Sequence, residues 1–175
     1  MEYRCLNIEE INTKIFSDFV RHQNVTKCYR RENSCWKVKD DPFIDDWTPD
    51  DYKKLVSDLR RTVNSGGFVY AALLNGNIKG FVSVESEIFD EGERYMDLSS
   101  IHVSEESRGF GIGTKLFYAA ADFARKKGAK KLYISSHSAL ESQIFYRGLG
   151  CVDAKITNKK HVEKEPFDCQ IEYKL

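Results

Sequence analysis

Arg108-Gly-Phe-Gly-Ile-Gly113 decides the fold, because it joins a strand-like run to an amphipathic helix. Its alternate glycines leave no side chains in the way of a large anion and allow dihedrals that turn peptide N–H groups toward one point. The helix that follows adds free N–H groups and the positive end of its dipole. Arg108 can bind phosphate oxygens through two donors. The stretch therefore predicts a cradle for a phosphate or pyrophosphate.

The glycine spacing distinguishes between the known phosphate-binding loops. A dinucleotide-binding loop needs Gly-x-Gly-x-x-Gly, but Thr114 replaces the third glycine counted from Gly109, and Leu116 replaces it counted from Gly111. A nucleotide P-loop needs Gly-Lys-Ser/Thr after a four-residue gap, and the chain has no such run. The pattern that fits is Arg-x-x-Gly-x-Gly.

That pattern resembles the acyl-CoA-binding motif of the GNAT superfamily of N-acetyltransferases, in particular its small bacterial-type members. The segments around it resemble, in order, the family's fourth strand, cofactor-binding helix, fifth strand and next helix: 95–103, 112–127, 131–135 and 138–149. The last of these carries Phe145-Tyr146 ahead of Gly148-Leu-Gly150-Cys151, similar to the family's Phe-Tyr…Leu-Gly-Phe signature.

The resemblance implies a single α+β domain over residues 1–175. We expect a mixed, mostly antiparallel sheet of about seven strands flanked by about four helices. The similarity covers residues 66–175, the expected acetyl-CoA-binding core, and leaves 1–65 as the acceptor side. A chain of 175 residues is ample for one core and short for two domains.

Local patterns predict elements in the remaining sequence. Apolar residues between 8 and 20 fall close to one helical face, whereas 24–47 reads as irregular. Thr48-Pro-Asp-Asp51 predicts the start of a helix that runs to about Val63. Strands are expected near both ends of the chain and on either side of the Asn75-Gly76 hairpin dipeptide, at 3–8, 68–74, 78–89, 95–103 and 167–173.

Composition excludes several classes of function. Lysine plus arginine and aspartate plus glutamate both number 27, so no net field favours nucleic acid or an anionic membrane. No apolar run approaches the ~20 residues needed to cross a bilayer, and we expect no signal segment. The five cysteines include no Cys-x-x-Cys pair, which predicts reduced thiols in the cytoplasm and no metal site. A homodimer stays possible.

The resemblance also implies which residues bind acetyl-CoA. Backbone groups of Ile101, His102 and Val103 would pair with the pantetheine arm, much as a peptide adds to a sheet edge, and one N–H there would polarise the acetyl carbonyl. The loop and first helical turn would hold the pyrophosphate: Arg108, Gly109, Phe110, Gly111, Ile112, Gly113 and Thr114.

Acetyl transfer also requires that the amine loses a proton and that the departing thiolate gains one. Tyr146 matches the family's general acid, and a phenol with an ordinary pKa of about 10 is protonated at neutral pH. Asp97, eleven residues before Arg108, lies where some family members place a carboxylate base. Its competitors are Glu85, Glu87 and His102, and an already neutral amine needs no base.

One position departs from the family pattern. Many members carry a cofactor-contacting Asn seven residues before the Tyr, where this chain has Ala139. His137 or Ser142 is a candidate substitute.

An aspartate-rich stretch beside Trp36, Phe43 and Trp47 lies where the family builds its acceptor site. Its members are Asp40, Asp41, Asp45, Asp46, Asp50 and Asp51. An acidic, aromatic wall suits a cationic amine through ion pairing and cation–π contact. The alternative is a solvated loop whose acids cap the next helix or pair with the five basic residues between Arg21 and Lys37.

The sequence thus predicts an acetyl-CoA-dependent N-acetyltransferase acting on a primary amine, a small cationic molecule in the favoured interpretation. Transfer would be direct within a ternary complex, because none of the five cysteines has a motif marking it as a nucleophile. The alternative is a CoA-binding or sensing module of the same fold that lacks catalysis. A nucleic-acid-binding domain is disfavoured by the zero net charge.

Overall fold

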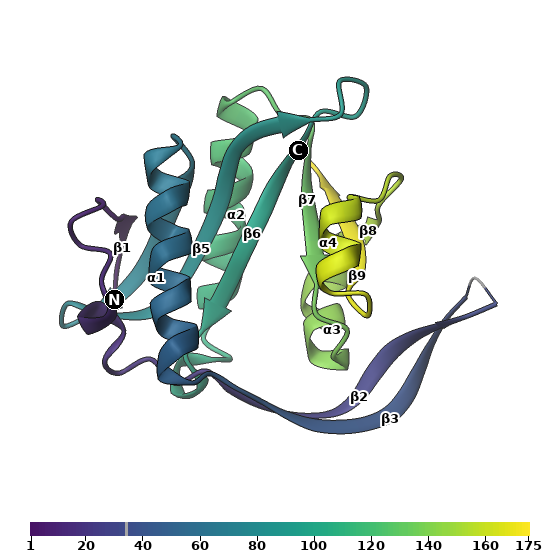
Figure 1. Ribbon diagram of the computed structural model, residues 1–175, viewed down its shortest axis with the longest axis horizontal. Helices are drawn as coiled ribbons and strands as arrows, with labels where there is room; N and C mark the ends of the chain where they lie inside the picture. The colour runs from purple at the N-terminus through teal and green to yellow at the C-terminus, as the bar shows by residue number, and fades with distance from the viewer. Residues whose placement is uncertain (34) are drawn as a thin grey trace.

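The computed structural model describes residues 1–33 and 35–175 and confirms the α+β class. A seven-stranded sheet has the order β1-β4-β5-β6-β7-β9-β8, and a separate ribbon pairs β2 with β3 (Figure 1). Among the described strands of this sheet, only β6 and β7 are paired in parallel. The strands of the main sheet are β1 (Glu2–Cys5), β4 (Phe68–Leu74), β5 (Asn77–Phe89), β6 (Tyr95–Val103), β7 (Lys131–Ser136), β8 (Val152–Asp153) and β9 (Cys169–Lys174).

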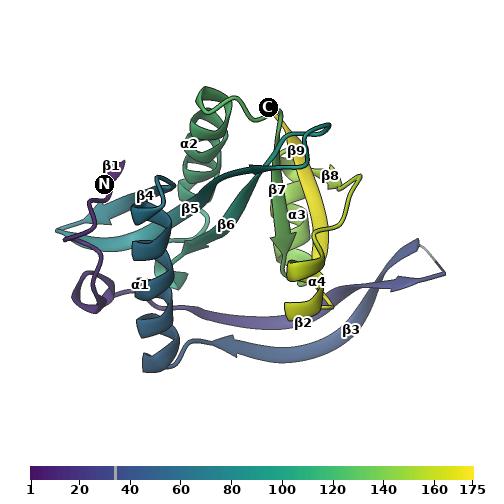
Figure 2. The same ribbon diagram turned by 45° about the horizontal axis from the view of Figure 1, so that its top comes forward.

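Helices cover both faces of this sheet, with α1 and α4 on one side and α2 and α3 on the other (Figures 1 and 2). The main core lies between the sheet and α2 and α3, and a second cluster lies under α1. The helices are α1 (Pro49–Asn64), α2 (Ile112–Lys126), α3 (Leu140–Gly148) and α4 (Lys159–Lys164).

The predicted start of α1 is confirmed in detail. The Thr48 side chain accepts a hydrogen bond from the Asp51 N–H at 3.3 Å, and the Asp51 carboxylate accepts from the Thr48 N–H at 2.8 Å. This reciprocal capping box satisfies two N–H groups that the helix itself cannot bond. The Asn75-Gly76 turn is also confirmed, because both residues have positive φ, 53° and 83°, as the tight hairpin turn requires.

The prediction of a helix from the apolar residues between positions 8 and 20 is wrong. The segment forms turns and one short 3₁₀ helix, η1 (Thr13–Phe16). The Asn12 side chain accepts from the N–H groups of Lys14 and Ile15, and this cap begins a tight turn that ends after four residues. Ile11, Phe16 and Phe19 are buried nevertheless. The periodicity reflected burial in a compact loop and not a helical face.

The prediction that residues 24–47 are irregular is also wrong. This part of the chain forms the two-stranded ribbon of β2 (His22–Glu32) and β3 (Cys35–Asp46). Within β2 only Val25 and Cys28 are buried, so the strand shows no alternation of apolar and polar residues. The ribbon runs from the start of α1 past the start of α3 (Figures 1 and 2). It is tied there by the Tyr29 N–H, which donates to the Ser138 carbonyl at 2.8 Å.

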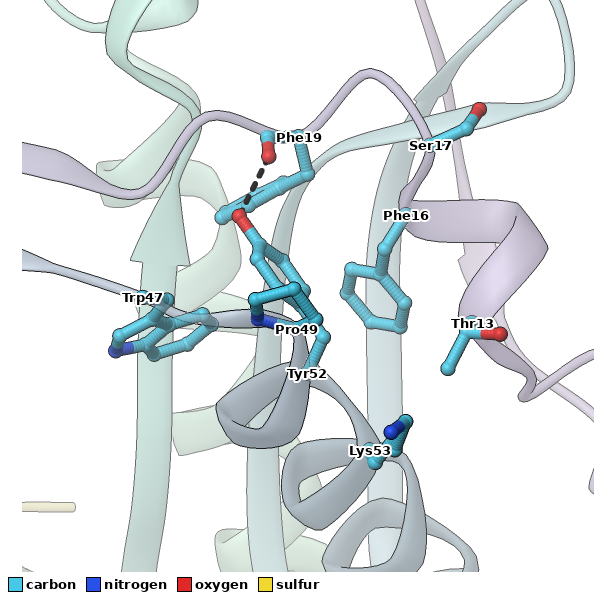
Figure 3. A pocket seen from close by; sticks show the side chains of 8 residues that line it. All are labelled: Thr13, Phe16, Ser17, Phe19, Trp47, Pro49, Tyr52 and Lys53. Carbon is cyan, nitrogen blue, oxygen red and sulfur yellow. Dashed lines mark hydrogen bonds between the residues drawn. The ribbon is translucent and has the colours of Figure 1, made fainter.

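A groove lies where the ribbon meets η1 and the start of α1 (Figure 3). The Tyr52 hydroxyl crosses it and donates to the Phe19 carbonyl at 2.6 Å. Trp47, at the end of the ribbon, is the one groove residue shared with the predicted acceptor wall. The lining residues are Thr13, Phe16, Ser17, Phe19, Trp47, Pro49, Tyr52 and Lys53.

Candidate functional site

The centre of the site is the point where β6 and β7 separate. They pair only through residues 95–97 of β6 and 131–133 of β7. Beyond Asp97 this edge of β6 has no partner strand among the described residues, so its backbone groups can bind an extended ligand. Ile101, His102 and Val103 lie on this open edge. A β-bulge precedes them, because Val84 pairs with Leu98 and Ser83 with Ser100, which leaves Ser99 as an extra residue.

The glycine-rich loop follows the open edge directly. Arg108 fastens the two together, since its Nε donates to the Val103 carbonyl at 3.1 Å. Gly109 and Gly111 have φ of 81° and 76°, and no atom lies within 4 Å of the place where a Cβ would stand. Gly111 is the N-cap of α2 and supplies no side-chain cap. Within the described part of the chain, no N–H from 109 to 114 donates to another protein group. These donors are available to an anion.

Gly113 has a different reason to be glycine. A Cβ there would stand 3.2 Å from the ring of Phe145 on α3. Its lack of a side chain brings α2 and α3 together, so this glycine serves packing as well as the loop backbone.

Tyr146 lies on α3 and is 8% exposed. Its ring packs against Phe145 and Phe117, with centroids 5.1 Å and 6.3 Å away. Burial is the main cause that raises the pKa of the Tyr146 phenol well above its ordinary value, and the nearby Cys151 and Asp168 add to it. The phenol is therefore protonated at neutral pH, as a proton donor must be.

Asp97 is the last residue of β6 that still pairs with β7, and its carboxylate is not free. Its Oδ2 lies 2.7 Å from Nε2 of His161 on α4, and its Oδ1 is buried without a partner. The hydrogen bond to Asp97 is the main cause that raises the pKa of His161. Sequence reasoning missed His161, because α4 was not predicted and a single histidine among lysines carries no pattern.

The three residues that compete with Asp97 for the role of the base, His102, Glu85 and Glu87, are placed less favourably for accepting a proton. Burial, followed by the charges of Arg21 and Arg108, lowers the pKa of His102 to about 3, so this imidazole cannot take a proton at neutral pH. The Glu85 carboxylate accepts from the Thr62 hydroxyl at 2.9 Å and lies near α1. Glu87 is exposed on the far part of β5.

Most carboxylates of the aspartate-rich stretch already have partners within the protein. Four of its carboxylates meet basic side chains, and Asp51 belongs to the helix cap. Among the described residues, Asp40 alone of the six has neither a basic partner nor a role in the helix cap. The pairs are Asp45 with Arg21, Asp41 with Arg30, Asp46 with His22 at 2.6 Å and Asp50 with Lys53 at 2.8 Å.

Aromatic residues of the ribbon contact both sides of the separation between β6 and β7. The Trp47 ring lies 4.7 Å from the His102 ring of β6. The Phe43 ring lies 5.5 Å from the ring of His137, which follows β7. The ribbon therefore crosses the open end of the separation.

Ala139, which departs from the family pattern of an Asn at this position, is a buried packing residue in the structure. Ala139 is fully buried and bridges to Cys28 of the ribbon. His137 is engaged locally, because its Nδ1 accepts from the Ala139 N–H at 3.2 Å. The buried amide of α3 is Gln143, whose Nε2 donates to the Ser136 hydroxyl and the His137 carbonyl, both at 2.9 Å, and whose Oε1 has no partner. The sequence signal that could have identified Gln143 as a site residue is its position three residues before Tyr146, on the same helical face.

Comparison with known proteins gives a consistent result. The model of the acetyltransferase (GNAT) family matches residues 27–151. Nourseothricin acetyltransferase has a similar structure, with a TM-score of 0.72 and 16% identity over 99% of this chain and 97% of that chain. A putative streptothricin acetyltransferase from Bacillus anthracis str. Ames, in complex with acetyl coenzyme A, has a TM-score of 0.70 and 16% identity over 98% and 95%. At such identity these likenesses show the fold alone.

A third structure, PaiA N-acetyltransferase from Thermoplasma acidophilum in complex with coenzyme A, has a TM-score of 0.60 and 15% identity over 99% of this chain and 98% of that chain. No curated protein matches the chain significantly. Among the described residues, no helix has the length and apolar character that a bilayer crossing needs.

Proposed function

Because this chain belongs to the acetyltransferase (GNAT) family, we propose that it transfers the acetyl group of acetyl-CoA directly to the primary amine of a small molecule. One observation carries the proposal. The loop with unpaired N–H groups, the open edge of β6 and the protonated Tyr146 belong to consecutive elements around one separation in the sheet. The pyrophosphate would lie on residues 108–114, and the pantetheine arm along Ile101 to Val103.

The chemistry assigns one task to each group. The amine nitrogen forms a bond to the acetyl carbon, a β6 backbone N–H stabilises the carbonyl oxygen, and the carbon–sulfur bond breaks. Tyr146 donates its proton to the departing sulfur, and the phenolate recovers a proton that the new amide nitrogen releases. Burial raises the pKa values of Cys151 and Cys169 to about 12, which supports direct transfer because a protonated thiol is a poor nucleophile.

We propose that residues 1–65 form the acceptor side and 66–175 the cofactor core. The ribbon supports this division, since Phe43 and Trp47 lie beside the open separation. For a cationic acceptor, the aromatic faces are the available attraction, because Asp41, Asp45 and Asp46 already have basic partners within the protein. Asp40→Asn tests the remaining charge. A cationic acceptor should show a higher KM in this variant, and the difference should shrink with salt.

The alternative is a module that binds CoA without catalysis. Calorimetry with acetyl-CoA, together with CoA release and product mass over a panel of primary amines, separates the two. We expect tight binding and an acetylated product with at least one amine. Tight binding with no product from any amine would favour the sensing module. Absence of binding would overturn the assignment of the loop.

A further inference from the structure

We propose that His161 takes the proton from the acceptor's ammonium group, and that Asp97 is the positioning residue that orients its ring. The proposal rests on the acetyl transfer proposed above. His161 belongs to α4, which the family model match at residues 27–151 does not reach.

Asp97 and His161 meet on the face of the sheet opposite the main core. Met96 and Leu98 point into the core shared with α2 and α3, so Asp97 between them points to the opposite face of the sheet. On that face α4 brings His161 over the end of the β6–β7 pairing (Figures 1 and 2). His102 lies further along β6 and faces the same side, toward Phe81 and Trp47. An acceptor held against the ribbon would therefore meet the face that carries the pair.

The contact with Asp97 determines the tautomer of the His161 imidazole ring. A carboxylate only accepts hydrogen bonds, so the 2.7 Å contact with Asp97 fixes the proton of the neutral ring on Nε2. Within the described residues Nδ1 forms no hydrogen bond, which leaves its lone pair free. The ring lies 5.8 Å from the Tyr133 ring, and its side chain is 27% exposed, whereas that of Asp97 is 14% exposed. Solvent or an acceptor can therefore reach the imidazole, while its partner stays inside.

The other bases nearby are less suited than His161 to accept this proton. His102 stays neutral because burial lowers its pKa to about 3. His137 already uses its Nδ1 lone pair on the Ala139 N–H. Asp168 accepts from the Ser135 hydroxyl at 3.1 Å, and burial raises its pKa. His161 is the described group on this face that combines a free lone pair with a basicity above that of ordinary histidine.

The groups that face His161 come from three directions. Asp97 on β6 and Asp168 before β9 favour the charged ring, whereas burial and Lys164 on the same helix oppose it. Tyr133 on β7 lies beside the ring, and its hydroxyl accepts from the Asn158 N–H at 2.8 Å. The net shift is upward, so the ring becomes a free base only as the pH rises through this raised pKa. The rate of transfer should rise over the same range.

The proton balance of the step is complete. The neutral Nδ1 of His161 accepts one proton from R–NH₃⁺, which gives R–NH₂ and an imidazolium. The free amine then attacks the acetyl carbon, and the imidazolium later releases its proton to water. The overall reaction of an ammonium ion with acetyl-CoA yields an amide, CoA thiol and one proton, and this is the proton that His161 carries.

His161→Gln removes the base and keeps a polar side chain on a surface helix. We expect kcat/KM for the amine at neutral pH to fall roughly ten- to ten-thousand-fold and the rise of rate with pH to disappear. Acetyl-CoA affinity should not change. Lys160→Gln is the matched control, because Lys160 is an exposed residue of the same helix whose side chain forms no ion pair among the described residues. This control should keep the wild-type pH profile.

NMR titration of His161 supplies a readout independent of turnover. Asp97→Asn should lower the His161 pKa, because the variant removes the charge that favours the imidazolium. An active wild-type protein whose pH profile persists in His161→Gln would overturn this inference alone. An unchanged His161 titration in Asp97→Asn would overturn the positioning role. Wild-type protein that acetylates no amine would overturn the proposed function, and this inference with it.

Discussion

Tyr146→Phe removes one oxygen atom from a side chain that is 8% exposed, so its effects can be worked out closely. The ring contacts with Phe117 and Phe145 remain, and the hydroxyl forms no hydrogen bond within the described residues. The free energy of unfolding should therefore change by less than about 1 kcal/mol. The maximal rate should fall roughly ten- to ten-thousand-fold, the usual span for a lost general acid, which corresponds to about 1.4 to 5.4 kcal/mol of barrier.

The assay is CoA thiol release at saturating amine, with the KM for acetyl-CoA measured in parallel. That KM should hardly change, because the interaction is made mainly in the transition state. Burial raises the pKa of the phenol above its ordinary value of about 10. Tyr146 should thus cause no loss of rate below about pH 10. Tyr118→Phe, on an exposed part of α2, is the control for loss of a phenol.

Two results would refute this reasoning. An unchanged maximal rate in Tyr146→Phe would remove Tyr146 from the mechanism and leave it as a packing residue. A decline of the wild-type rate near pH 8 that vanishes in the variant would show that the phenol ionises readily, against the effect of its burial.

Three further predictions concern the loop, the ribbon and α1. Gly111→Asp should keep the fold, because its Cβ would meet no atom within 4 Å and Asp tolerates positive φ. Its acetyl-CoA affinity, measured by calorimetry, should fall at least about tenfold. Unchanged affinity would contradict the assignment of the loop as a phosphate cradle. Asp45→Asn should lower the melting temperature by several degrees, because it leaves the guanidinium of Arg21, whose side chain is 9% exposed, without its carboxylate; an unaltered melting curve would contradict this. Thr48→Ala should cost about 1 kcal/mol in urea unfolding by removing the helix cap, whereas Ser should restore most of it.

The cofactor half of the fold could be predicted because its signals are local. Glycine spacing, the helix after Gly111 and the Asn75-Gly76 turn each specify backbone geometry within a few residues. The ribbon could not be predicted in this way. Its strands pair mainly with each other and expose both faces, so the alternation that identifies a strand is missing.

Within the site too, residues marked by local signals could be predicted, whereas contacts between distant parts of the chain could not. Asp97 could be selected by its distance from Arg108 along the chain, but its partner His161 lies 64 residues away on a short helix. Only the tertiary fold brings the two together. Asp45 pairs with Arg21 and Asp41 with Arg30 because the fold of the ribbon brings them together, although its register places Lys37 opposite Arg30. No pattern in the sequence reveals these pairs.

The ribbon has a consequence for how such a protein can change its choice of acceptor. It is a separate two-stranded sheet, joined to the main sheet through chain connections and a few contacts such as Tyr29 with Ser138. Most of its outward side chains can vary without opening a cavity in either core. Selection could therefore diversify residues 22–46 while the catalytic frame stays constant. For protein engineering, this segment is the natural target for a focused library, and chimaeras that exchange it between related chains should fold.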